Sequence, residues 1–249
     1  MDITTIIVVA VMAAVLIVML VCKKSMATSP MLQPVLFLCV ALELGGVGYV
    51  IWKNVGGKGS SGIINNQLAF YHSRGYVAGE YLAQKAPGKK LLLIASPGWE
   101  TSRMDNKLIE ALKKTYGEVE VDTIEVPPNA EEQGIMISEL MTNKALDAVI
   151  DKHPGVGVVA FLYGLPENPQ RMKVLSKKDH PVIFLFETGS AEGKWLAKKI
   201  ADETISGVII AKSGVKHTTP PKRKDKDTFD VRYILVNKDN LDANRARIE

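Results

Sequence analysis

LLLIA, residues 91–95, is a continuous apolar run of strand length, and Ser96-Pro97-Gly98 ends it. Strands that are apolar at every position are typical of parallel sheets, because such sheets are buried on both faces. Before this run, apolar side chains recur three and four residues apart from Leu68 to Leu82, which predicts a helix. A buried strand next to an amphipathic helix predicts an α/β domain.

The same alternation continues toward the C-terminus. We expect a long helix over 137–149, and a later helix that Ser190 caps. Strands that alternate with helices predict a doubly wound, mostly parallel sheet of five to six strands, in the order 2-1-3-4-5. The expected fold is therefore a flavodoxin-like, three-layer domain. The further strands are expected at 119–126, on a sheet edge, and at 156–163, 182–186, 207–211 and 231–236.

Two apolar segments precede this domain. Residues 3–22 carry no charge, and this length is enough to cross the hydrocarbon core of a membrane. A second segment runs from 32 to 52, with Glu43 near its middle and glycines after it that allow close helix packing. An ionisable side chain at that depth is either functional or a protonated hydrogen-bonding group between helices.

These features divide the chain into four parts. We expect a two-helix transmembrane anchor at 1–52 and a Gly/Ser linker at 53–62. The α/β domain then covers 63–213, and a basic polar tail with an edge strand covers 214–249. Lys23 and Lys24 lie between the two apolar segments, and positively charged loops stay cytoplasmic. The expected location is the inner cell membrane, with the α/β domain extracytoplasmic.

Composition excludes several classes of protein. The net charge of +4 can be assigned to the stretch from Lys212 onward, where ten Lys and Arg face six Asp and Glu. The folded middle is near neutral, which argues against a nucleic-acid partner. Both cysteines, Cys22 and Cys39, lie in the apolar segments, so the α/β domain has no cysteine nucleophile or cysteine metal site. The four histidines are scattered, and we expect no metal, no cofactor and no catalytic residue.

One segment resembles a known family. GYVAGEYL, residues 75–82, leads through Gly88-Lys89-Lys90 into the apolar run at 91–95. This pattern is similar to the start of the C-terminal lobe of type I periplasmic binding proteins, a family that includes sugar-binding proteins, and the similarity extends to about residue 213. The resemblance implies a periplasmic-binding-protein-like fold and a small polar solute such as a sugar. That family encloses its ligand between two lobes, and this chain has only one.

A ligand of such a sheet binds beyond the carboxyl ends of the strands. Trp99 could stack on a ring while Glu100 and Arg103 bind hydroxyls; the alternative is a surface loop whose Trp covers a helix end. The loop from Glu187 to Ser190 could hold an anion on its backbone amides, or could only cap a helix. The candidate ligand-binding residues are Ser96, Trp99, Glu100, Arg103, Tyr163, Glu187, Thr188 and Ser190.

Three functions remain open. The first is a non-catalytic, membrane-anchored module that binds or senses a solute. The second is an interaction or scaffold subunit of a membrane complex, with a homo-oligomer or another membrane protein as partner, that keeps the fold without a ligand. The third is a hydrolase or transferase, for which the sequence offers no G-x-S-x-G or H-E-x-x-H motif.

Overall fold

The computed structural model describes residues 3–25, 33–51, 58–130, 134–177, 179–216 and 218–249. These residues form two compact units, Met1–Asn65 and Asn66–Glu249. In the first unit, α1 (Ile3–Ser25) and α2 (Gln33–Ile51) pack against each other. A Cβ on Gly46 would lie 2.8 Å from the sulfur of Met12, so this glycine lets the two helices approach closely. Around Gly45 and Gly48 the space within 4 Å is open.

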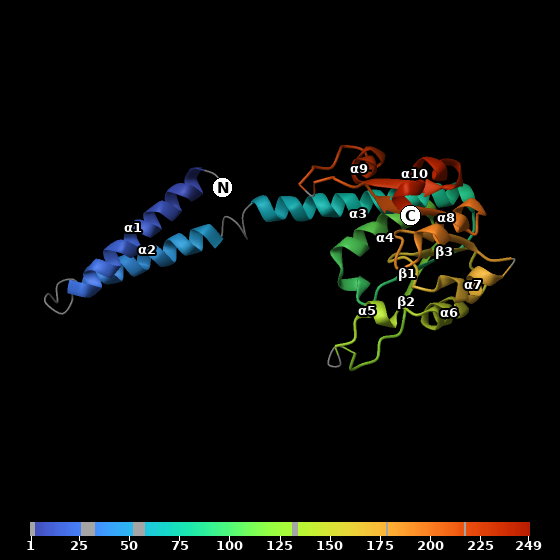
Figure 1. Cartoon of the computed structure of the whole chain (residues 1–249), viewed down its shortest axis with the longest axis horizontal. Coiled ribbons are helices and arrows are strands. Elements are labelled where there is room, and N and C mark those ends of the chain that lie inside the picture. The colour runs from blue at the N-terminus through green and yellow to red at the C-terminus, as the bar shows by residue number, and fades with distance from the viewer. Residues whose placement is uncertain (1–2, 26–32, 52–57, 131–133, 178, 217) are drawn as a thin grey trace. The chain divides into compact units, whose positions relative to one another are not determined.

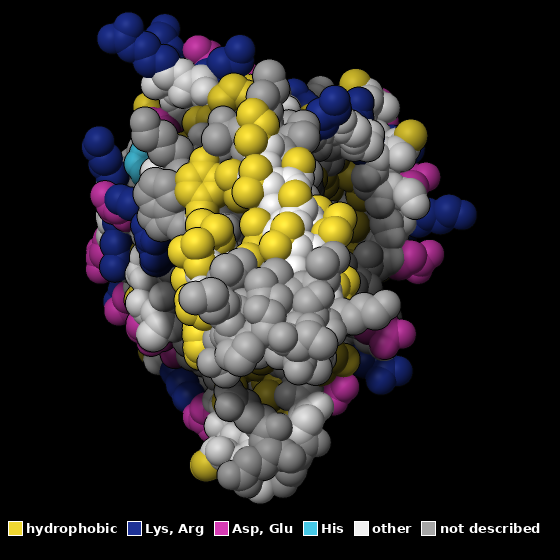
Figure 2. All heavy atoms as spheres, turned by 90° about the vertical axis from the view of Figure 1, so that its left-hand side faces the viewer, with side chains coloured by type: hydrophobic (Ala, Val, Ile, Leu, Met, Phe, Trp, Pro, Cys, Tyr) yellow, Lys and Arg dark blue, Asp and Glu magenta, His cyan; other side chains and the backbone are white. Residues whose placement is uncertain are grey.

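The described surface of this helical pair is apolar. Leu20 and Phe37 are 69% and 75% exposed, and ten further large hydrophobic side chains of the two helices are exposed as well. Figure 2 looks toward this unit and shows hydrophobic side chains gathered on it. Within the part of the chain that the structure describes, no helix meets the length and apolarity needed to cross a membrane. The two membrane spans therefore stay predictions.

The expected linker is only partly described. Residues 53–57 lie outside the described residues, whereas 58–62 are helical and begin α3 (Lys58–Lys85). The Gly/Ser composition predicted a flexible segment here, but the helical pattern of the following residues extends back through it.

The second unit contains the expected parallel sheet (Figure 1). Its order is β2-β1-β3-β4-β5-β6, which confirms the predicted order and adds the sixth strand at the edge beside β5. The first five strands are parallel, and β6 pairs with β5 in antiparallel fashion. The strands are β1 (Leu91–Ala95), β2 (Val119–Thr123), β3 (Val158–Phe161), β4 (Val182–Leu185), β5 (Ile205–Ala211) and β6 (Tyr233–Asn237).

Helices cover both faces of this sheet and form a three-layer unit. Leu91 and Leu93 of β1 pack with side chains of α3, α4 and α9, whereas Leu92 and Ile94 pack with α6, α7, α8 and α10. Alternate residues of a strand point to opposite faces, so an all-apolar strand requires both layers. The helices are α4 (Arg103–Tyr116), α5 (Ile137–Leu140), α6 (Asn143–Asp151), α7 (Lys173–Ser176), α8 (Gly193–Ala201), α9 (Asp225–Arg232) and α10 (Leu241–Ile248), with short 3-10 turns η3 (Trp99–Thr101), η4 (Pro169–Arg171) and η5 (Lys238–Asn240).

Two expectations about helices were wrong. The long helix over 137–149 is broken into α5 and α6, because the Thr142 hydroxyl accepts a hydrogen bond from the Ala145 amide at 3.2 Å and caps a new helix. Ser190 does not cap α8, which begins at Gly193 with Glu192 at its N-cap. The tail is also more ordered than its composition indicated, since α9 and α10 flank β6.

Candidate functional site

A cleft of about 810 Å³ lies at the carboxyl ends of the parallel strands in the α/β unit. Residues of the loops that follow β1, β3 and β4 contribute to it, as expected for an open parallel sheet. Two further walls come from the connection between β2 and α6 and from the loop that leads to η4. The lining residues are Ser96, Ile137, Glu139, Met141, Thr142, Asn143, Tyr163, Leu165, Pro166, Glu167, Asn168, Arg171, Gly189 and Ser190.

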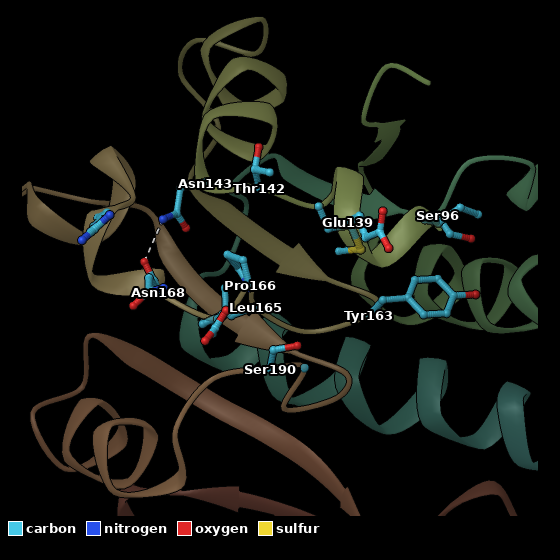
Figure 3. Close-up of a pocket in the computed structure, with 14 residues that line it drawn as sticks. Ser96, Glu139, Thr142, Asn143, Tyr163, Leu165, Pro166, Asn168 and Ser190 are labelled. Atoms are coloured by element: carbon cyan, nitrogen blue, oxygen red, sulfur yellow. Dashed lines mark hydrogen bonds between the residues drawn. The ribbon is translucent and has the colours of Figure 1, made fainter. Parts of the chain in front are cut away.

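Tyr163 and Ser96 form one end of the cleft (Figure 3). The Tyr163 hydroxyl donates a hydrogen bond of 2.8 Å to Oδ2 of Asp105, a carboxylate that is only 3% exposed. Asp105 lies in the first turn of α4, where the helix dipole favours a negative charge. Burial raises the pKa of Tyr163 far above its usual range, so the phenol stays protonated. The aromatic ring is thereby fixed and can contribute a flat apolar surface to the cleft.

Two loops, one after β3 and one after β4, meet at the floor of the cleft. Leu165 and Gly189 form an isolated parallel bridge, and the Ser190 amide donates to the Leu165 carbonyl at 2.8 Å. A Cβ on Gly164 would collide with the backbone of Gly189, so only glycine fits at this crossing. The Ser190 amide is thus already bonded, and the loop does not lead directly into α8. This geometry removes the basis for an anion site at that amide.

A polar wall lies at the opposite end, where Asn143 and Asn168 meet (Figure 3). The Asn143 Nδ2 group donates to the Asn168 carbonyl at 2.8 Å. Its Oδ1 atom is buried, and no hydrogen-bond partner for it is present among the described residues. Thr142 lies beside it in the wall, with a hydroxyl that also caps α6.

This wall was missed by the sequence analysis. The pattern over 137–149 predicted a single helix, which would have carried these polar side chains away from the strand ends. The available signal was Thr142 followed by Asn143, since both residue types favour helix N-termini. Glu139 and Glu167, also missed, add two exposed carboxylates to the lining, and Arg171 adds a guanidinium.

The structure places some of the eight candidate residues in the cleft lining and others elsewhere. Ser96, Tyr163 and Ser190 line the cleft. Trp99 lies in η3 and packs against the core beside α4, which fits the alternative in which it covers a helix end. The other four do not line this cleft: Glu100 and Arg103 are exposed on η3 and at the start of α4, and Glu187 and Thr188 lie on the loop after β4.

Glu187 has another partner. Its Oε1 atom lies 3.2 Å from Nη2 of Arg74, a side chain of α3 that is only 3% exposed. The same nitrogen donates to the Phe186 carbonyl at 2.6 Å. The guanidinium also lies 5.2 to 5.9 Å from the ring centres of Tyr71, Phe186 and Tyr233. Glu187 therefore compensates a buried positive charge and anchors the end of β4.

The cleft offers hydrogen-bonding groups of mixed kind. Hydroxyl, amide, carboxylate and guanidinium groups surround an apolar floor, and none of the described lining residues is His or Cys. No group of three or more His, Cys, Asp or Glu suited to a metal ion occurs within the described ranges. Such a lining is typical of sites that orient a small polar molecule.

No family model matches this chain, and no curated protein matches it. Among solved structures, it is similar to AraP, an arabinose binding protein from Geobacillus stearothermophilus, with a TM-score of 0.44 and 15% identity over 70% of this chain and 62% of that one. It is also similar to a carbohydrate transporter from Acidothermus cellulolyticus 11B in complex with myo-inositol, with a TM-score of 0.46 and 12% identity over 72% and 61%. A third is an ABC transporter solute binding protein from Agrobacterium vitis bound with alpha-D-tagatopyranose, with a TM-score of 0.45 and 15% identity over 74% and 60%.

The chain spans less than two thirds of the length of each of these proteins. Likeness at this level carries no argument about ligand or partner. The mostly parallel six-stranded sheet is the α/β architecture that the sequence predicted.

Proposed function

We propose that this chain is a non-catalytic solute-binding module whose ligand is a small polar molecule rich in hydroxyl groups, such as a sugar. The observation that carries the proposal is the cleft of about 810 Å³ at the strand carboxyl ends. Its volume falls in the range of small-molecule sites, roughly 300 to 1,000 Å³. The Tyr163 ring gives it a flat apolar surface, and amides and hydroxyls at the other end give it hydrogen-bonding partners.

The binding experiment uses the full chain in detergent micelles. Sugars, polyols, nucleosides and amino acids are screened by ligand-observed NMR, and we expect hits among sugars or polyols. Because the cleft is open, we expect dissociation constants near the millimolar range, which corresponds to about 4 kcal/mol. Asn143→Ala and Ser190→Ala should abolish the signal.

A matched control tests whether the cleft is the site. Trp99→Ala and Arg103→Ala alter side chains outside the lining, so they should leave binding intact. Hits that vanish in these variants and persist in Asn143→Ala would move the site to η3. The absence of any hit in the whole screen would contradict the proposed function.

We further propose that α1 and α2 hold the module in the inner cell membrane, with the α/β unit on the extracytoplasmic side. The exposed apolar side chains of both helices support this proposal, because surfaces of this kind mark membrane or protein contacts. Lys23 and Lys24 between the two segments support the orientation.

Orientation can be tested with single cysteines in a background that lacks Cys22 and Cys39. A membrane-impermeant thiol reagent should label Asn65→Cys, an exposed position at the end of the first unit, in cells whose outer barrier is opened. Ser29→Cys, in the basic connection, should react only after the inner membrane is lysed. The reverse labelling pattern would invert the orientation, and loss of the protein from membranes in a carbonate wash would refute the anchor.

The same apolar surface supports a second candidate function, an interaction subunit of a membrane complex. This candidate predicts a stable assembly in membranes and no solute binding. Cross-linking of the full chain in membranes, together with the solute screen, separates the two.

A further inference from the structure

The two edges of the sheet differ in chemistry. The β2 edge strand carries Glu120 and Asp122, both of which bond His153, and Glu120 also pairs with Lys90 at 2.6 Å. Charged side chains on an edge strand discourage pairing with another chain. The other edge strand, β6, has the sequence YILVN and carries no charged side chain.

The hydrogen bonds of β6 can be followed group by group. The Lys212 amide donates to the Arg232 carbonyl across the antiparallel pair. Backbone groups in an antiparallel pair alternate between facing the partner strand and facing away. With this register, the backbone amides and carbonyls of Ile234 and Val236 face β5, whereas those of Tyr233, Leu235 and Asn237 point outward.

Several of these outward groups are already bonded. Asn240 supplies two bonds, because its Nδ2 group donates to the Leu235 carbonyl at 2.9 Å and its Oδ1 atom accepts from the Asn237 amide at 3.0 Å. The Tyr233 amide donates to the Phe229 carbonyl. Within the described part of the chain, the outward Leu235 amide and the outward Tyr233 carbonyl have no partner. An edge strand whose backbone N–H and C=O groups lack partners in the protein can pair with an added strand.

A hollow of about 410 Å³ lies along this part of the edge. Val77, Phe229 and Leu235 give it an apolar floor, and its charged lining side chains are Lys212, Lys226 and Asp230. The Lys226 ammonium pairs with Glu80 at 2.9 Å but remains 66% exposed. The hollow thus combines two open backbone groups with an apolar floor and a lining in which two basic side chains outnumber one acidic side chain.

We propose that β6 is a docking edge for an extended peptide of a partner protein, which adds to the sheet as a parallel strand. In parallel pairing, one residue of the added strand gives its amide to the carbonyl of residue i and accepts from the amide of residue i+2. The Tyr233 carbonyl and the Leu235 amide have this relation. Strand addition obtains affinity from main-chain bonds and specificity from alternate side chains.

The hollow defines the side chains of that peptide. An apolar side chain fits over Phe229 and Leu235, and acidic neighbours complement Lys212 and Lys226. The partner is therefore a segment that alternates apolar and acidic residues. This surface is separate from the solute cleft, since the two share no lining residue.

The test uses the full chain in detergent micelles, 15N-labelled at leucine, and the synthetic peptide acetyl-Val-Glu-Val-Glu-Val-amide as the probe. The Leu235 signal is assigned with the Leu235→Ile variant. Addition of the peptide should shift this signal and slow its hydrogen exchange about tenfold, as expected for an amide that gains a hydrogen bond of typical strength. A peptide that is N-methylated at its central residue should lose these effects.

Two variants sharpen the test. Asn240→Ala frees the Leu235 carbonyl and the Asn237 amide, so the probe should bind several-fold more tightly. Lys212→Glu together with Lys226→Glu should weaken the acidic probe several-fold and favour acetyl-Val-Lys-Val-Lys-Val-amide instead. Such a charge swap would not follow from partial unfolding.

Three results would overturn the proposal. The first is an unchanged Leu235 signal at millimolar peptide. The second is equal binding by the N-methylated peptide, which would indicate a purely apolar contact. The third is concentration-dependent protection of the Leu235 amide without peptide, which would identify a second copy of this chain as the occupant of the edge.

Discussion

The hydrogen bond between Tyr163 and Asp105 connects the cleft to the core, and it gives a sharp quantitative prediction. Tyr163→Phe keeps the ring but removes the hydroxyl that donates to Oδ2 of Asp105 at 2.8 Å. The carboxylate is 3% exposed, so water has little access to replace the lost donor. The variant should therefore lower the free energy of unfolding while leaving the shape of the cleft unchanged.

The magnitude follows from the charge on the acceptor. Hydrogen bonds to charged groups contribute about 1.5 to 3 kcal/mol, and we expect about 2 kcal/mol because the tyrosine is only half-buried. Tyr116→Phe is the matched control, since its hydroxyl donates to the carbonyls of Ala86 and Lys89 at 3.2 and 2.6 Å. Those bonds are neutral and more exposed, so that change should cost about 0.5 to 1 kcal/mol.

A double-mutant cycle isolates the pair. Asp105→Asn keeps an acceptor but removes the charge, and the free energies of Tyr163→Phe, Asp105→Asn and the double variant are measured by urea unfolding of the full chain in mild detergent. The coupling energy should be about 1 to 2 kcal/mol, in the range for directly bonded side chains. A coupling near zero, or equal losses for Tyr163→Phe and Tyr116→Phe, would show that the Asp105 carboxylate does not depend on this bond.

Three further predictions concern other parts of the molecule. Gly75→Ala should destabilise the α/β unit by about 1 to 3 kcal/mol in urea unfolding, because the added Cβ would overlap the Leu108 carbonyl where α3 crosses α4. A neutral effect would refute the close crossing of these helices. The hydrogen bond to Asp122, with a smaller contribution from the one to Glu120, raises the pKa of His153. The stabilisation from this histidine is therefore complete below about pH 6.5 and is lost as the pH rises through the pKa of the folded state. His153→Gln should flatten the profile of melting temperature against pH between about pH 6 and 8, and an unchanged profile would contradict this assignment. Glu43→Leu should stabilise the packing of α1 on α2, because one oxygen of Glu43 is buried without a partner among the described residues, whereas Glu43→Gln should not; hydrogen exchange of the two helices in micelles distinguishes these outcomes.

The fold was readable from the sequence because its main signals are local. The five residues of β1 are all apolar and all buried, and the alternation of strands and helices left few topologies. The glycines at 75 and 79 also belong to a readable pattern, although their reason lies in the structure, where both meet α4 without space for a side chain. The tail was only partly readable, because its strand at 231–236 was predicted whereas its polar composition hides the two helices α9 and α10.

The site was only partly readable, for a physical reason. The rule that ligands bind at strand carboxyl ends led to Ser96, Tyr163 and Ser190, which the structure places in the cleft lining. It could not reveal that Glu187 pairs with the buried Arg74, which is 113 residues away in the sequence. Nor could helical spacing alone show that Thr142 ends one helix and begins another. Long-range charge pairing is invisible to local patterns, and a cap signal inside a periodic segment is easily overlooked because the periodicity continues through it.

The shape of the cleft also bears on the proposed solute binding. With only the strand ends as a floor, a small ligand would remain largely in water. Here the segment from Ile137 to Asn143 rises on one side and the turn from Leu165 to Arg171 on another, so three sides of the cleft come from one chain. The Asn143–Asn168 bond joins these two walls. If the cleft binds a solute as proposed, Asn143→Ala should reduce binding below detection both by removing an amide and by separating the walls.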